Sequence, residues 1–183
     1  KDVWNWVGTP GQTVNSFSDF SKAPERLDNG AVPKRPRMSV MSPADWWGMV
    51  GSQTALFQER LVARGYEQGE IENVAGISTD MDQNIRTQVS GTPTGTPITT
   101  SAVGQTGSAI LTQGWTASTV VLKKGDVVQF TGVYAVNGQN RQTVIMPNVG
   151  SLTTGLADWV VTADVTSGSG RGAATIPIAG PDG

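Results

Sequence analysis

The sequence predicts an α+β fold, with a charged first half that mixes helices and strands and a charge-poor second half of antiparallel strands. The chain has 13 Lys and Arg and 15 Asp and Glu, yet only eight of these lie beyond residue 91. Between the halves, the run Ser90–Pro97 consists of Ser, Gly, Thr and Pro and has the composition of a linker. We therefore expect two domains, residues 1–91 and residues 92–183.

The first predicted element is a short helix or turn over Ser18–Leu27, which ends at Asn29-Gly30 and whose length Pro24 limits. The next is a buried strand over Arg37–Ser42, because apolar and small residues are concentrated there.

A helix over Pro43–Val50 follows, since Ser42 is a good N-cap and proline suits the first helical position. A second helix is expected over Thr54–Ala63. Two short strand-like runs complete the first half: Glu70–Val74 and Ala75–Ser78.

The second half predicts a small antiparallel barrel or sandwich, because short β-type runs alternate with Gly, Ser, Thr and Asn. Lys123–Asp126 and Asn137-Gly138 are predicted turns between consecutive antiparallel strands. Gly132 should mark a bend or bulge, with Asp126–Thr131 pairing with Tyr134–Val136 or its neighbours. The expected strands are Ser108–Leu111, Val120–Leu122, Asp126–Thr131, Tyr134–Val136, Trp159–Ala163 and Ala174–Ile178.

Composition excludes several classes of function. With no His and no Cys, the chain has no Ser-His-Asp or Cys-His catalysis, no Cys/His zinc site and no disulfide. A net charge of −2 and a pI of about 5.0 give no basic surface for nucleic acid or an anionic membrane. We predict no enzymatic activity, no catalytic, cofactor-binding or metal-binding residues and no cofactor.

Two acidic groups are candidate sites. Asp80 and Asp82 form an Asp-x-Asp pair, which suits a divalent cation, although a solvated loop explains the pair more simply. Glu67, Glu70 and Glu72 offer paired carboxylates for acid–base chemistry, but Glu70 and Glu72 would share a solvent-facing side of a strand.

Other motifs also have structural explanations. Lys34, Arg35 and Arg37 form a basic cluster typical of a solvated turn. Lys124-Gly-Asp126 resembles an integrin-binding tripeptide, and the Gly-rich runs Gly104–Gly107 and Ser167–Gly172 resemble phosphate-binding loops, although neither leads from a strand into a helix.

Six tryptophans allow either packing or carbohydrate binding. Trp46 and Trp47 are neighbours on one predicted helix, about 100° apart, so both cannot face one core. The others are Trp4, Trp6, Trp115 and Trp159.

The run from Lys123 to Gln142 resembles a segment of the major coat protein family of short-tailed Salmonella-type phages and related prophages. That segment has Lys-Gly-Asp, an apolar stretch, Gly-Val-aromatic and then Asn. Further resemblances keep the family's order along the chain: Pro33–Asp45, Gly69–Ser78, Gly114–Ser118, Trp159–Asp164 and Gly172–Ile178.

The resemblance implies part of the axial domain of the tailed-phage capsid fold, followed by an inserted small antiparallel β-barrel. It implies a capsid subunit that assembles with copies of itself and with scaffolding and portal proteins. The location would be the virion, and the bacterial cytoplasm during assembly. The family's long N-terminal arm, spine helix and C-terminal return are not seen between Lys1 and Gly183, so an internal fragment is expected.

A coat subunit without membrane or sequence-specific nucleic-acid partners is therefore the favoured function. The alternative is a non-catalytic β-rich binding module of a phage tail or cell-surface protein that recognises carbohydrate through tryptophans. An enzyme that uses carboxylates is a third hypothesis and would need two acids about 5–10 Å apart in a cleft.

Overall fold

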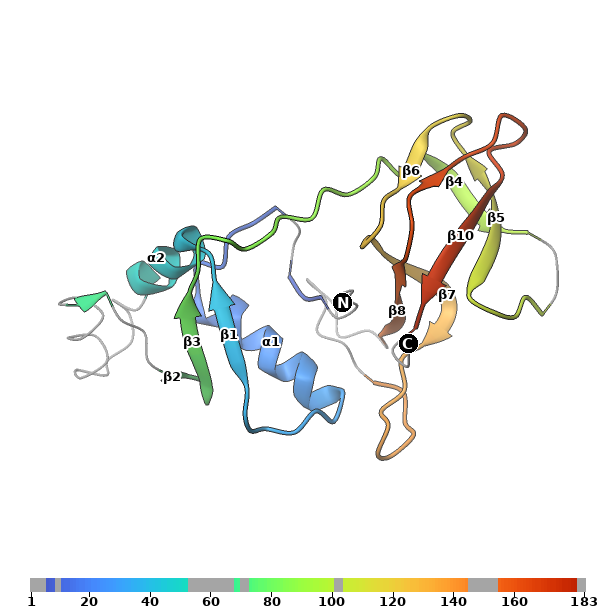
Figure 1. The fold of residues 1–183 in the computed structure, drawn as a ribbon. Coiled ribbons are helices and arrows are strands. Elements are labelled where there is room, and N and C mark those ends of the chain that lie inside the picture. Colours follow the sequence, from blue (N-terminus) through green and yellow to red (C-terminus); the bar gives the residue numbers. More distant parts are fainter. Residues whose placement is uncertain are drawn as a thin grey trace. The chain divides into compact units, whose positions relative to one another are not determined.

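A computed structural model describes residues 6–8, 11–52, 68–69, 73–100, 104–144 and 155–180. The chain divides into two compact units (Figure 1). The mixed unit comprises Trp6–Arg86 and Tyr134–Gly155, and the β unit comprises Thr87–Val133 and Leu156–Gly183. The chain thus enters the β unit at Thr87, and residues 134–155 group with the mixed unit.

The mixed unit begins with helix α1, Phe17–Asn29. Ser16 is its N-cap, and the Ser16 hydroxyl accepts a hydrogen bond from the Asp19 N–H at 3.1 Å. The short helix predicted here is confirmed: it contains Pro24, as the expected range did, and it ends at Asn29 with Gly30 as its C-cap. A proline removes one backbone hydrogen bond, and here the remaining turns and the burial of Phe20 are sufficient to continue the helix.

Helix α2, Pro43–Ser52, starts as predicted. The Asp45 N–H donates to the Ser42 hydroxyl at 3.3 Å, and that hydroxyl donates to Asp45 Oδ2 at 2.6 Å. Asp45 Oδ1 also accepts from the Val14 N–H at 2.7 Å, which fixes the preceding segment on the helix start. The helix predicted over Thr54–Ala63 lies outside the described residues.

Three strands form the sheet of this unit, in the order β1-β3-β2: Met38–Met41, Ile77–Met81 and Asn73–Val74, respectively. β1 and β3 are parallel, whereas β2 and β3 form a hairpin in which Val74 faces Ile77. The two residues between them, Ala75 and Gly76, both have positive φ (51° and 77°), as a type I′ turn requires.

The core of the mixed unit is small. Its buried apolar residues come from both helices and all three strands: Phe20, Met41, Trp46, Met49, Val74 and Ile77. β1 was expected to be a buried strand, but it is an edge strand whose Met38 and Val40 side chains are 71% and 54% exposed. Only Met41 at its end is buried, so the apolar content of this run does not reflect burial.

The β unit contains a curled five-stranded sheet in the order β4-β5-β10-β8-β7 and a separate pair, β6 with β9 (Figure 1). The bounds of the sheet strands are Gly95–Thr99, Ala109–Trp115, Ala174–Ala179, Leu156–Val161 and Val127–Tyr134, in that order. β6 is Val120–Leu122 and β9 is Val165–Thr166.

Register decides which residues face the core of the β unit. Ala174 lies opposite Thr112 and Ile176 opposite Ile110 in the antiparallel pair of β10 and β5. These positions turn inward, whereas Leu111, beside Thr175, is exposed. The buried apolar core consists of Trp115, Val121, Leu122, Val161, Val165, Ala174, Ile176 and Ile178.

The predicted strands are largely confirmed, but their predicted pairing is wrong. Lys123–Asp126 is a turn, yet the strands on either side of it, β6 and β7, are not partners: β6 pairs with β9, and β7 lies next to β8. β7 also continues through Gly132, at φ 87°, so Asp126–Thr131 does not pair with Tyr134–Val136. The residues of the turn determine that the chain reverses direction there, but the burial of side chains determines which strands pair.

The turn at Asn137 is confirmed in a longer form. Val136 and Thr143 form an antiparallel bridge, and the Asn137 carboxamide oxygen accepts from the Gln139 N–H at 2.8 Å. The positive φ falls on Arg141 and not on Asn137 and Gly138. The side chain of Asn137 therefore closes a wider loop in place of a two-residue turn.

Part of the expected linker is a strand. Residues 95–97 of the run Ser90–Pro97 begin β4, which pairs antiparallel with β5. A Gly, Thr and Pro composition does predict irregular backbone, and the β4 register indeed shifts between Gly95 and Ile98. An edge strand with a proline and a bulge is thus easily mistaken for a linker.

Candidate functional site

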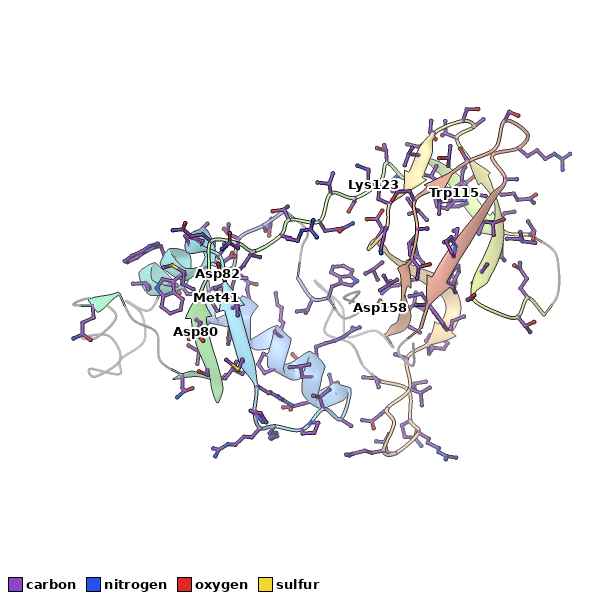
Figure 2. The ribbon with its side chains drawn as sticks, in the orientation of Figure 1. Met41, Asp80, Asp82, Trp115, Lys123 and Asp158 are labelled. Atoms are coloured by element: carbon purple, nitrogen blue, oxygen red, sulfur yellow. The ribbon has the colours of Figure 1, made fainter. Side chains whose placement is uncertain are left out.

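Among the sequence motifs that lie in the described residues, Asp126, between β6 and β7, is a buried carboxylate with several hydrogen-bond donors. The residue is 7% exposed. Oδ2 accepts from the backbone N–H groups of Lys123 at 2.8 Å and Gly91 at 2.9 Å, and Oδ1 accepts from the Gln88 amide at 3.3 Å. Because this carboxylate is used internally, Lys124-Gly-Asp126 is not presented as an adhesion tripeptide. Lys123, in the same turn, is labelled in Figure 2.

Hydrogen bonding lowers the pKa of Asp126. Burial alone acts to raise it, and this is the largest single influence, but donors from Lys123, Gly91, Gln88 and Ser90 together outweigh it. The ionised form is therefore the one that the fold stabilises.

Stability should accordingly depend on this group at acid pH. A carboxyl whose pKa is lower in the folded state stabilises the protein above its unfolded pKa of about 3.9 and loses that contribution as pH falls through the folded value. We expect the free energy of unfolding to fall more steeply below about pH 4 in the wild type than in Asp126→Asn, which should already be less stable at neutral pH. Urea titrations of both proteins between pH 3 and 7 would measure this, and parallel curves would contradict it.

A hollow of about 290 Å³ lies in the mixed unit beside α1 and β1. Phe20 and Met41 contribute apolar surface to it, and Asp19, Lys22 and Asp45 contribute charge. These charges already have partners: Lys22 Nζ lies 2.8 Å from Asp19 Oδ1, and Asp45 bonds to Ser42 and Val14. The hydrogen bond from Lys22, followed by that from Ser16, holds the pKa of Asp19 below its usual value. The charges therefore serve the fold and do not offer an open binding site.

The Asp-x-Asp pair is not assembled into a cation site. Asp80 lies on β3 and Asp82 just after it (Figure 2). Asp82 Oδ1 accepts from the Asn84 N–H at 2.7 Å, which closes a local turn. Among the described residues, no three acidic side chains gather closely enough to hold a metal ion. Glu67, Glu70 and Glu72 lie outside the described residues.

The basic cluster is partly structural. The Arg37 guanidinium lies 2.7 Å from Asp28 Oδ1 and donates to the carbonyls of Val32 and Pro33. Arg37 thus ties the loop after α1 to the start of β1, whereas Lys34 and Arg35 are exposed.

The Gly-rich runs are connections between strands. Ser167–Gly172 joins β9 to β10, and the Gly168 N–H donates to the Ala173 carbonyl at 2.8 Å. Gln105, between Gly104 and Gly107, bonds through its side chain to the backbone of Leu111 in β5. Both lead from strand to strand, which is not the geometry of a phosphate-binding loop.

The tryptophans divide between the two cores and the surface. Trp46 is buried and its indole N–H donates to the Gly69 carbonyl at 2.8 Å, whereas Trp47 is 58% exposed, with its ring beside Gly69. The expectation that this pair cannot share one core is confirmed. Trp115 is buried in the β unit, where Figure 2 labels it, and Trp159 packs against the same core. Trp4 lies outside the described residues.

Sequence reasoning missed the exposed apolar face of β1. Met38 and Val40 project on the side of the sheet opposite to the buried Met41, and the β3 residues in register with them are Ser78 and Asp80. A period-two pattern shows that one face differs from the other, but it does not show which face a helix covers.

Comparison with known proteins gives the family. No helix among the described residues is long and apolar enough to cross a membrane. No curated protein matches the chain. The family model described as "P22 coat protein - gene protein 5" matches residues 5–169, which include most of both units and the Lys123–Gln142 run but end before β10. Coat proteins of this family are structural components of phage capsids, and the chain belongs to the P22 coat protein family.

Proposed function

We propose that the chain is a structural subunit of a phage or prophage icosahedral capsid and that it self-assembles into the virion shell. The observation that carries this proposal is the family match over residues 5–169, which spans about nine-tenths of the chain. The buried and internally bonded polar groups support a structural role, because Asp126 and Arg37 serve the fold.

We further propose that residues 1–91 form part of the axial domain of the capsid fold and that residues 92–183 are its inserted antiparallel β-barrel. Support comes from the curled sheet, which has its own buried core, and from the separate helix-bearing core of the mixed unit.

The partners that follow from this role are copies of the same chain in the capsid lattice, with scaffolding and portal proteins during assembly. The location would be the virion, and the bacterial cytoplasm while shells form. Membranes and sequence-specific nucleic acid are not among the proposed partners, since the chain has a net charge of −2.

Immunogold electron microscopy tests this function against the carbohydrate-binding alternative. Antibody raised against the chain should decorate the icosahedral shells of particles whose genome encodes it, at many copies per particle. Label confined to tails, or binding of the chain to immobilised saccharides without label on shells, would overturn the proposal. Antibody preabsorbed with the chain provides the control.

A further inference from the structure

We propose that Asp126 acts as a clasp that holds residues 88–92 on the β unit, so that at the crossing between Arg86 and Thr87 the chain can bend only before Gln88. The Trp6–Arg86 segment of the mixed unit ends at this crossing and the Thr87–Val133 segment of the β unit follows it, so residues 88–92 lie at the start of that β-unit segment. The inference concerns the chain itself and does not depend on capsid assembly.

The clasp joins parts of the chain that are about 35 residues apart. Gly91 donates its backbone N–H to Asp126 Oδ2 at 2.9 Å. The Gln88 amide donates both to Asp126 Oδ1 and, at 2.9 Å, to the Lys124 carbonyl. Gln88 and Gly91, which lie three residues apart, therefore both donate hydrogen bonds to one carboxylate.

Close backbone packing accompanies these bonds. A Cβ on Gly91 would lie 2.6 Å from the Val121 carbonyl oxygen and 2.7 Å from Leu122 Cα, closer than real Cβ atoms come. Only glycine allows the segment to lie this close to β6. The Thr92 N–H then donates to the Val120 carbonyl at 3.4 Å, which continues the contact along β6.

The partners of the Asp126 carboxylate are neutral donors, so its own charge provides the attraction. Charged residues on the neighbouring elements are Lys123 and Lys124 of its own turn and Asp164, which follows β8 and accepts the Lys124 N–H at 2.8 Å. Hydrogen bonds to a charged acceptor are roughly twice as strong as hydrogen bonds between neutral groups. Neutralising the Asp126 carboxylate therefore weakens all of its hydrogen bonds to residues 88–92 together.

Asp164 provides a matched control, because its carboxylate also accepts a backbone N–H of this turn but has no hydrogen bond to residues 88–92 among the described contacts. The full-length wild type and the full-length variants Asp126→Asn and Asp164→Asn would be labelled with ¹⁵N. Their amide hydrogen-exchange rates would then be measured residue by residue by NMR. The Ile178 N–H, which donates to the Ser108 carbonyl at 2.8 Å, reports on the sheet.

We expect Gly91 exchange in Asp126→Asn to accelerate by about tenfold or more relative to Ile178, since the charged hydrogen bond is lost. In Asp164→Asn, Gly91 should exchange as in the wild type. The proposal is overturned if Gly91 and Ile178 accelerate equally in Asp126→Asn, which would make Asp126 a general stability residue, or if both variants release Gly91.

A second measurement avoids dependence on a variant that fails to fold. In the wild type, the Gly91 amide signal should titrate at acid pH with the midpoint of Asp126, while Ile178 keeps its native position. In Gly91→Ala, the added Cβ should displace residues 88–92 from β6. The Gln88 and Gly91 donors should then no longer reach the Asp126 carboxylate, so the pKa of Asp126 should rise. Loss of both signals in one transition, or an unchanged pKa in Gly91→Ala, would contradict the clasp.

Discussion

Replacing Ile176 with alanine is expected to lower the free energy of unfolding of the β unit by about 3 kcal/mol, within the range for large-to-small changes in a core. Ile176 is 2% exposed at the centre of β10, the strand that lies between β5 and β8. The loss combines the transfer of three carbon atoms out of the core with the cavity that they leave. Urea unfolding followed through the amide signals of the β unit would measure it.

Thr175→Ala is the matched control, because Thr175 precedes Ile176 on the same strand but is exposed on the other face. It should change stability by no more than about 0.5 kcal/mol, as surface substitutions usually do. Equal losses in the two variants would mean that the register of β10, and with it the position of the core, is different.

Truncation should have the second large effect. Residues 87–183 are expected to unfold cooperatively on their own, whereas residues 98–183 should be less stable by about 2–4 kcal/mol, because several charged or backbone hydrogen bonds are removed together. The shorter piece lacks Gln88 and Gly91, which bond to Asp126, and it lacks the first part of β4. A buried carboxylate without its donors adds a desolvation cost.

Circular dichroism melts of the two pieces would decide this. A piece of residues 1–86 is the comparison, and it should show no sharp transition, since its described core contains only six buried apolar residues. Equal melting temperatures for 87–183 and 98–183 would show that the segment before β4 does not stabilise the β unit.

Much of the local structure was determined by the sequence alone. Ser42 and Pro43 began α2, and β6 has the predicted bounds, because capping and β-type runs act within a few residues. The ordered motifs between Pro33 and Ile178 indicated the coat protein family, which the family match confirms. The absence of His and Cys was equally plain from composition.

Tertiary structure decided the rest, because it depends on contacts between residues far apart in the chain. Turn residues at Lys123–Asp126 predicted a reversal but not that β6 would pair with β9, since partner choice follows from shared burial. The apolar run of β1 gave no indication that its Met38 and Val40 side chains would be exposed at an edge. Asp126 looked like a surface turn residue, and only folding brings Gly91 to it and converts a turn carboxylate into a buried acceptor.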